Sequence, residues 1–249
     1  MERIQIKPQK NKKIYFAGDF HLGIPDEESS KIREDKIINW LSSIENHTQD
    51  LFLMGDVFDF WFEYKHVVPK YYFNFLSKIS RMIENGVNIH FFKGNHDMWT
   101  IDYFEKIGLK VYVNHQTFKV DKTRILVGHG DGLGEGDRGY KIMKSIFKNK
   151  ICQYLFRLIH PDLGMKLGTS LSKSNKTKKD ETKKNNDRIY NFCKKHELSN
   201  SNHAYIFGHS HRESNMQISK SSTYFNTGEW INGSSYLVYE SGRFKIKTF

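Results

Sequence analysis

The sequence predicts an α/β protein in which two β-sheets pack on each other and helices flank them. Apolar runs of strand-like composition alternate with helix-like segments in the first half of the chain, and several closely spaced runs follow near its end. The chain has 249 residues, of which 38% are hydrophobic and 14% aromatic. This length and composition allow a large core, so we expect one domain over residues 1–249 with an inserted helical segment.

Five apolar runs, each followed within two residues by a glycine and then by polar residues, define the first group of expected strands. They cover residues 13–17, 50–54, 88–92, 124–127 and 204–207. Between the first three runs, helical periodicity over residues 37–44 and about 70–85 indicates two helices. Three more runs are expected to form adjacent strands that close the fold: 223–226, 235–239 and 244–247.

Positive charge is concentrated in one segment. The formal net charge of the chain is +11, and residues 141–184 contain twelve Lys and Arg against three acidic residues. Such a block favours contact with phosphates, whether of a nucleic acid, an anionic lipid or a nucleotide. A solvated basic surface without a partner is the alternative that the composition leaves open.

An apolar stripe runs through the same basic segment. Its members approximate helical spacing: Met143, Ile146, Phe147, Ile151, Tyr154, Leu155 and Leu158. We therefore expect residues 138–184 to form a basic helical lid inserted between the fourth and fifth strands. An apolar stripe beside cationic side chains can bind a lipid or an anionic membrane, but it can equally pack on the body of the protein.

Polar motifs follow the five strands at the point where each one ends. They are GDFH (18–21), GDVFD (55–59), GNHD (94–97), GHGD (128–131) and GHSH (208–211). Loops at the carboxyl ends of strands in α/β sheets form the crevice where ligands bind, so these motifs can converge. Each motif alone is weak evidence, because an Asp after a strand commonly caps a turn or a helix. The complete set predicts a shared site.

The candidate ligands of this site offer carboxylate, amide and imidazole groups and no thiolate. They are Asp19, His21, Asp56, Asn95, His129, His209 and His211. This donor set suits divalent ions such as Mn²⁺, Fe²⁺ or Zn²⁺, whereas a closed structural zinc site would typically recruit cysteine. Seven ligands exceed the needs of one catalytic ion, so we expect two divalent ions that share a carboxylate. Such a pair performs phosphoester or phosphoanhydride hydrolysis.

The five motifs together resemble the signature of the calcineurin-like metallophosphoesterases. The resemblance covers about residues 13–212 and implies a β-sandwich flanked by helices. It implies that one metal ion is held by Asp19, His21, Asp56 and His211. The other would be held by Asp56, Asn95, His129 and His209. Asp56 would then be the bridging ligand.

A narrower resemblance is to the UDP-2,3-diacylglucosamine pyrophosphohydrolases of lipid A biosynthesis. It is carried by the basic insertion and by GDVFDFW (55–61), HGDGLGEGDRGY (129–140), GHSHR (208–212) and TGEW (227–230). That family uses manganese to cleave the pyrophosphate of a lipid-linked UDP-sugar into UMP and 2,3-diacylglucosamine 1-phosphate, and its lid grips the acyl chains and the nucleotide. The resemblance implies substrate contacts at Asn95, His96, Asp137, Tyr140, Ser170, Ser172, Lys173 and His209.

His96 departs from the narrower resemblance. The best-known members of that family have arginine at this position, whereas the wider class has histidine. Arginine can only donate to phosphate oxygens, but histidine can also pass a proton to a leaving group. We therefore expect His96, together with Asp56, to act in catalysis, with Asp97 orienting His96. A helix cap before Met98 is the alternative role of Asp97.

The sequence contains no stretch that resembles a signal peptide and no run of eighteen apolar residues. Its two cysteines, Cys152 and Cys193, are far apart in sequence, which suits a reducing compartment. We therefore expect a cytoplasmic protein that associates peripherally with the cytoplasmic face of the inner membrane, where its lipid-linked UDP-sugar substrate resides. No obligate protein partner is inferred.

Two other functions are compatible with parts of the sequence. A metallophosphoesterase acting on another nucleotide or on a nucleic-acid phosphodiester would also use the basic segment. Residues 160–189, however, contain no Phe, Tyr or Trp on which single-stranded bases could stack, so no nucleic acid is expected. A metal-free scaffold protein would have lost ligands, and all seven candidates are present.

Overall fold

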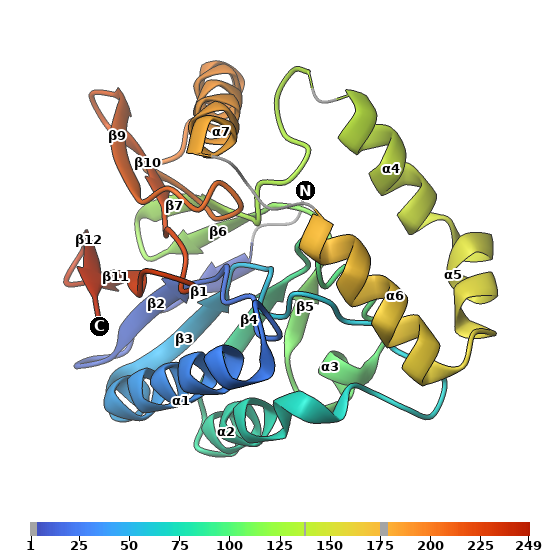
Figure 1. Cartoon of the computed structure of the whole chain (residues 1–249). Coiled ribbons are helices and arrows are strands. Elements are labelled where there is room, and N and C mark those ends of the chain that lie inside the picture. Colours follow the sequence, from blue (N-terminus) through green and yellow to red (C-terminus); the bar gives the residue numbers. More distant parts are fainter. Residues whose placement is uncertain (1–3, 137, 175–178) are drawn as a thin grey trace.

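The computed structural model describes residues 4–136, 138–174 and 179–249, which form two packed six-stranded sheets with helices outside them (Figure 1). The first sheet has the order β1 (Ile4–Ile6), β6 (Gln116–Val120), β7 (Thr123–Val127), β8 (Ala204–Phe207), β10 (Ser222–Asn226), β9 (Ser214–Ser219). The second has the order β12 (Arg243–Thr248), β11 (Ser235–Glu240), β2 (Lys13–Ala17), β3 (Thr48–Leu53), β4 (Asn88–Phe92), β5 (Lys110–Tyr112). The predicted two-sheet α/β fold is confirmed.

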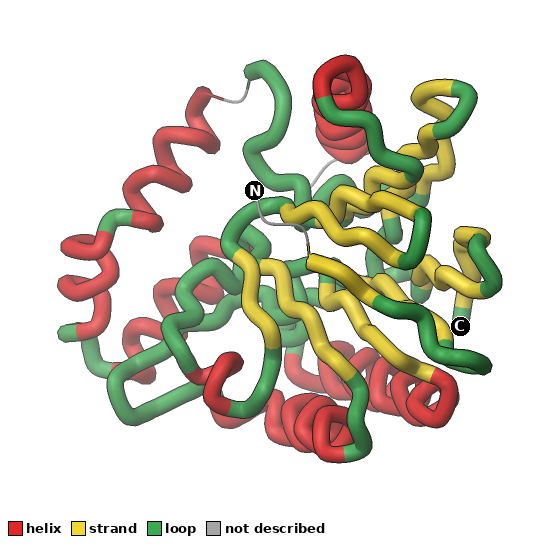
Figure 2. The backbone as a smooth tube through the Cα atoms, turned by 180° about the vertical axis from the view of Figure 1, so that it is seen from behind, coloured by secondary structure: helices red, strands yellow, loops and turns green. Residues whose placement is uncertain are grey.

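Helices cover the outer faces of both sheets. α1 (Glu27–Ile44), α2 (Phe73–Glu84) and the short α3 (Tyr103–Lys106) lie against the second sheet, and α7 (Lys179–Ser199) lies on the first. Seen from behind, the strands run between these helical layers (Figure 2). Two 3₁₀ turns span Glu45–His47 and Lys70–Tyr72. None of the helices in the described parts of the chain is long and apolar enough to cross a membrane.

The core between the sheets depends on aromatic side chains of the central strands. In β3, Phe52 points between the sheets, while Leu51 and Leu53 pack toward α1 and α2, as the alternation of strand side chains requires. Phe52 stacks on Phe16 of β2 with ring centroids 4.7 Å apart, and it meets Phe118 of the other sheet edge-on at 5.0 Å. Burying each such side chain contributes about 1.5–3 kcal/mol. These aromatic contacts therefore fix how the two sheets pack on each other.

The eight strands predicted from the sequence are confirmed, but their grouping is wrong at one point. β10 pairs with β8 and β9 in the first sheet, whereas β11 and β12 belong to the second sheet beside β2. The chain crosses between the sheets after β10, where the buried Trp230 joins the core under α1. Strands close in sequence usually pair, so turn signals alone did not reveal this crossing. Sequence patterns also missed β1, β5, β6 and β9.

Three helices form an arm that stands beside the sheets (Figure 1): α4 (Arg138–Lys148), α5 (Lys150–Arg157) and α6 (Pro161–Ser174). We call them the helical arm. Neither α4 nor α5, both described in full, has a buried side chain, and Ile146 and Leu155 are 52% and 56% exposed. The segment expected as a lid, 138–184, thus includes the arm and the start of α7. That helix continues to Ser199 along the first sheet.

α6 packs on the loop after β3 through a stripe of small residues. Gly164 and Gly168 lie one turn apart on the face that meets this loop, and a Cβ at Gly168 would overlap the ring of Phe60. One turn further along the same face, Ser172 donates to the carboxylate of Asp59. The missing side chains let the helix approach the loop closely, and this approach sets where Ser172 lies.

This packing predicts a difference between two glycine substitutions in the arm. Alanine adds up to about 1 kcal/mol of helix propensity at either position. At Gly168 it also overpacks against Phe60, which typically costs about 1–3 kcal/mol, whereas a Cβ at Gly139 in α4 meets open space. We expect Gly168→Ala to lower the free energy of unfolding in urea, and Gly139→Ala to leave it equal or higher. Equal stability of the two variants would contradict the close packing of α6.

Candidate metal centre

Five loops meet at one edge of the two sheets. The loops after β2, β3 and β4 come from the second sheet, and those after β7 and β8 come from the first. Main-chain bonds join them: Asp19 N donates to Gly55 O at 3.0 Å, and His21 N donates to Asp56 O at 2.9 Å. Five expected ligands have a left-handed φ, between 45° and 64°: Asp19, His21, Asp56, His209 and His211. Such a backbone is unfavourable for non-glycine residues and collects at functional sites.

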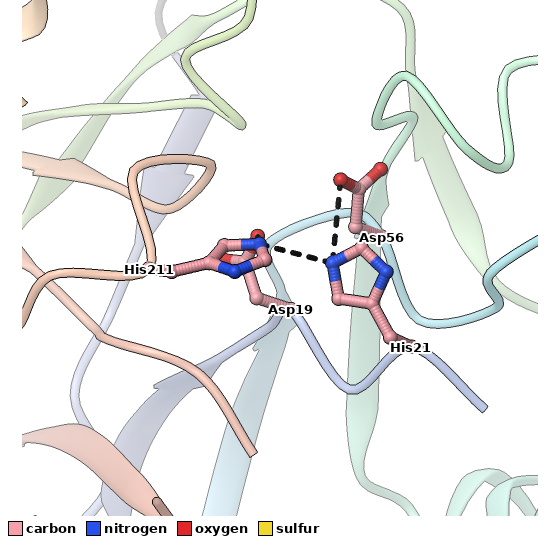
Figure 3. Close-up of side chains that lie close together, drawn as sticks. All are labelled: Asp19, His21, Asp56 and His211. Atoms are coloured by element: carbon pink, nitrogen blue, oxygen red, sulfur yellow. Dashed lines mark hydrogen bonds and ion pairs between the residues drawn. The ribbon is translucent and has the colours of Figure 1, made fainter. Parts of the chain in front are cut away.

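The first ligand group consists of four side chains (Figure 3): Asp19, His21, Asp56 and His211. One possible ligand atom from each lies within 4.8 Å of the others. The Nε2 atoms of His21 and His211 are 3.0 Å apart, and His211 Nε2 is 3.3 Å from Asp19 Oδ1. Two nitrogens that each bind one ion at about 2.1 Å, at right angles, are about 3 Å apart. The geometry of this group therefore fits a shared cation.

The second ligand group consists of Asp56, His129 and His209, again with one possible ligand atom from each within 4.8 Å of the others. His129 Nε2 lies 3.3 Å from Asp56 Oδ2 and 3.2 Å from Asn95 Oδ1, which adds an amide oxygen to the group. His129 Nδ1 donates to the Met54 carbonyl at 2.8 Å, since a carbonyl oxygen only accepts. This bond turns Nε2 toward Asp56. The structure thus brings all seven expected ligands together.

Asp56 belongs to both ligand groups and stays ionised despite its burial. Burial alone would raise the pKa of Asp56, but His129 and other nearby histidines hold that pKa well below its usual range. Burial opposes a charge on His129 too, yet the carboxylates led by Asp56 raise the pKa of His129 to about 10. Burial and His129 together lower the pKa of His209 to about 4. Such closely coupled acids and imidazoles suit divalent cations, because metal binding displaces protons from these ligands.

Gly94 lets the loop after β4 approach the shared carboxylate. A Cβ at this position would overlap Asp56 Oδ1 and also clash with Asp56 N. The close approach brings His96 N to within 2.9 Å of Asp56 Oδ1, to which it donates. A glycine is therefore required after the expected strand because no side chain fits between this loop and Asp56.

Asp97 has a role that differs from both expectations. Its Oδ1 accepts from Gly94 N at 2.7 Å, and its Oδ2 accepts from Val57 N at 2.8 Å. Residues 98–100 are not helical, so Asp97 caps no helix. The prediction that it orients His96 is also wrong, because its two oxygens bind the main chain of two loops. Asp97 fastens the loop that carries Asn95 to the loop that carries the shared carboxylate.

Asp59 takes the orienting role that was expected of Asp97. Its Oδ1 is 3.1 Å from His21 Nδ1, so Nε2 of that ring faces the first ligand group. Its main-chain oxygen accepts from His96 Nδ1 at 2.8 Å, and Ser172 Oγ lies 3.0 Å from the same nitrogen. The carbonyl requires the proton on Nδ1, so the lone pair of the neutral His96 ring is on Nε2. Asp59 ends the GDVFD motif, but no spacing in the sequence indicates these partners.

Four of the eight residues expected to contact a substrate lie on the helical arm: Tyr140, Ser170, Ser172 and Lys173. Ser172 points toward the metal centre, as described above, whereas Ser170 is exposed. Asp137 and the side chain of Lys173 lie outside the described residues. Of the two serines, whose side chains the structure describes, it brings Ser172 to the ligand groups.

Tyr140 reaches the centre through a network that the sequence did not reveal. Its hydroxyl donates to Asp131 Oδ2 at 2.6 Å, and the Lys144 ammonium bonds to the same carboxylate. The Tyr140 ring also lies near His209, with centroids 6.3 Å apart. The available signal was the position of Asp131 in the GHGD motif, two residues after His129. The partner on α4 could be found only from the fold.

Residues 12–213 match the calcineurin-like phosphoesterase family, and the chain belongs to this family. A UDP-2,3-diacylglucosamine hydrolase of Porphyromonas gingivalis strain W83 is 32% identical over 246 residues, which cover 92% of this chain and 94% of that protein. Proteins of the same name from Neisseria meningitidis serogroup B and Aliivibrio fischeri are 24% and 26% identical and cover 93% and 91% of this chain. The matched segments cover 95% and 94% of those two proteins. The resemblance seen in the motifs is confirmed.

The position of Asp97 leads to a test of the loop assembly. Asparagine has one carbonyl oxygen for two main-chain donors, so Asp97→Asn leaves a buried N–H without its acceptor, at a cost of about 1–3 kcal/mol. We expect a lower free energy of unfolding and a lower content of bound divalent metal after dialysis. The matched control is Asp102→Asn, because Asp102 forms an exposed ion pair with Lys106. Both properties should be unchanged in the control, and no difference between the variants would contradict the role of Asp97.

Proposed function

We propose that this protein is a two-metal hydrolase that cleaves the pyrophosphate of UDP-2,3-diacylglucosamine into UMP and 2,3-diacylglucosamine 1-phosphate. The observation that carries this proposal is the pair of ligand groups that meet at Asp56. Paired cations about 3.5–4 Å apart are suited to displacement at phosphorus. The substrate is proposed from the relatives that bear its name, which match more than nine-tenths of the chain.

The metal-ligand assignment follows the two groups. Asp19, His21, Asp56 and His211 would hold one ion, and Asp56, Asn95, His129 and His209 would hold the other. We propose Mn²⁺ for both positions, because carboxylate, amide and imidazole ligands without thiolate suit it. When bound, such ions neutralise phosphate oxygens and lower the pKa of a water molecule. Asn95 and His209 are also placed to contact the phosphate that the ions would attract.

His96 is the proposed general acid. The Asp59 carbonyl holds its Nδ1 proton, so its Nε2 can deliver a proton to the bridging oxygen of the leaving group. Water would attack the phosphorus that stays with UMP, and the bond from this phosphorus to the bridging oxygen would break. The lipid phosphate would then leave with that oxygen. Since α6 meets His96 through Ser172, the lipid would leave on the side of the helical arm.

The helical arm would bind the lipid half of the substrate. Its exposed apolar side chains include Ile142, Ile146, Ile151, Tyr154, Leu155, Leu158, Leu163 and Leu167. These side chains can bury acyl chains, and each methylene removed from water contributes about 0.8 kcal/mol. Ser172 is placed near His96 to bind the sugar phosphate, and Tyr140 lies near His209, where it could contact the substrate head group. Asp137, Ser170 and Lys173 remain proposed contacts on the resemblance alone.

The same arm would bring the enzyme to its substrate at the cytoplasmic face of the inner membrane. The lipid substrate resides in a bilayer, and apolar side chains mixed with lysines bind anionic lipid surfaces. The basic segment 141–184 includes α4, α5 and α6, which carry these apolar side chains. We therefore propose peripheral membrane association through the arm, without a protein partner.

The direct test is incubation of the manganese-loaded protein with UDP-2,3-diacylglucosamine in ¹⁸O water, followed by ³¹P NMR of the products. We expect UMP and 2,3-diacylglucosamine 1-phosphate in equal amounts, with ¹⁸O in UMP, and no turnover after chelation. Intact substrate at full metal occupancy would refute the proposed substrate.

A pair of histidine variants refines the same assay. Loss of a general acid typically lowers the rate by about 10²–10⁴-fold, so His96→Gln should lose that much kcat. His47→Gln is the control, because His47 is exposed in the 3₁₀ turn before β3. It should behave as wild type. Equal rates for the two variants would exclude His96 as the acid.

A further inference from the structure

A cavity of about 230 Å³ opens beside the second ligand group. Its walls come from the end of β4, the connection between β5 and β6, the loop after β7 and helix α4. His129 contributes to one wall, so the cavity reaches the proposed metal site. α6, by contrast, meets the centre at Asp59 and His96. The metal centre thus has two distinct sides, with α6 at His96 and this cavity, to which α4 contributes Lys144, at His129.

Positive charge lines one side of the cavity. Lys93 and Lys144 are among its lining residues, and Lys148 follows one turn later on α4. Burial and then the charge of Lys144 lower the pKa of Lys148. Burial also lowers the pKa of Lys93, against nearby carboxylates led by Glu105 and Asp97. Lys93 donates to the Thr100 carbonyl, and Lys144 to Asp131. Each ammonium has three donors, so both keep capacity for an anion.

The rest of the lining suits a flat heterocycle with polar edges. Val113 and Leu133 provide apolar surface, while Asn114 and His115 provide groups that can both donate and accept hydrogen bonds. Pockets for small ligands typically combine apolar walls with a few polar groups that fix orientation. A nucleobase needs this combination.

We propose that this cavity binds the nucleoside monophosphate half of the substrate. The inference rests on the proposed function and extends it by assigning the two halves of the substrate to two sides of the centre. In the proposed reaction the attacked phosphorus stays with UMP, and the lipid phosphate leaves on the side of His96 and α6. The nucleoside is attached to the attacked phosphorus through an oxygen other than the one that leaves, so it is free to extend away from α6. The cavity at His129 lies on that other side and carries the cations that a nucleotide phosphate requires.

The first test locates the base directly. The manganese-loaded full chain is crystallised with 5-bromouridine 5′-monophosphate, and anomalous scattering at the bromine edge shows where the base lies. We expect one bromine peak within the cavity lined by Leu133 and His115. A peak beneath α6 or on the solvent side of the metal centre would overturn the proposal.

The second test measures UMP affinity in solution by calorimetry with the manganese-loaded protein. Loss of one charge-assisted hydrogen bond to the phosphate corresponds to about a tenfold change in Kd. We therefore expect about a tenfold rise in the Kd of UMP for Lys144→Gln and no change for Lys141→Gln. Lys141 lies on the same helix and bonds to the Gly134 carbonyl. Leu133→Trp retains every charge but fills the cavity, so it should also weaken UMP binding about tenfold.

A readout that does not involve a phosphate separates binding from folding. Manganese content and the far-ultraviolet circular dichroism spectrum should equal those of the wild type in Lys144→Gln and Leu133→Trp, because neither change touches a metal ligand. If both variants keep wild-type affinity for UMP, the cavity does not bind the nucleotide and the proposal is wrong.

These measurements also separate this inference from the proposed function. UMP binding is measured without the lipid, so normal UMP binding in the cavity without cleavage of UDP-2,3-diacylglucosamine would refute the proposed function alone. Cleavage of that lipid, with UMP affinity unaffected by Lys144→Gln and Leu133→Trp, would refute the cavity assignment alone.

Discussion

The whole site depends on one buried carboxylate, Asp56, that two groups of ligands share. Asp19 and His21 reach it from the second sheet, whereas His129 and His209 reach it from the first. Each ligand group therefore spans the interface between the sheets. The ring contacts of Phe52 with Phe16 and Phe118 hold this interface together. Packing in the core and geometry at the centre are coupled for this reason. A shift of one sheet against the other would separate the ligands of both groups at once.

A shell of main-chain and carboxylate contacts around Asp56 keeps this arrangement in place. Asp97 joins two of the ligand-bearing loops, and Asp59 orients one ligand ring and the His96 ring. Gly94 removes the side chain that would otherwise displace the shared carboxylate. The left-handed backbone of five expected ligands is unfavourable in isolation, so these contacts have to offset its cost. The arrangement of the seven expected ligands thus constrains residues outside that set.

Most strands and the meeting of the five loops could be predicted from the sequence, because local patterns determine strands and their ends. Apolar runs marked eight strands, and a polar motif after five of them marked where the loops would meet. The partners of Asp97 and Asp59 were not predictable, since they are main-chain atoms and side chains of loops far apart in sequence. The separation of β10 from β11 was missed because no local signal distinguishes a turn within a sheet from a crossing between sheets. The contact of Ser172 with Asp59 likewise depends on how closely α6 approaches Phe60.

The central claim is that Asp56 holds two cations at once. The most direct measurement is the anomalous scattering of manganese in crystals of the protein grown with Mn²⁺. Two peaks about 3.5–4 Å apart are expected on either side of the Asp56 carboxylate. His21 and His211 would contact one peak, and His129 and His209 would contact the other. A single peak at full occupancy, or peaks that do not contact Asp56, would contradict it.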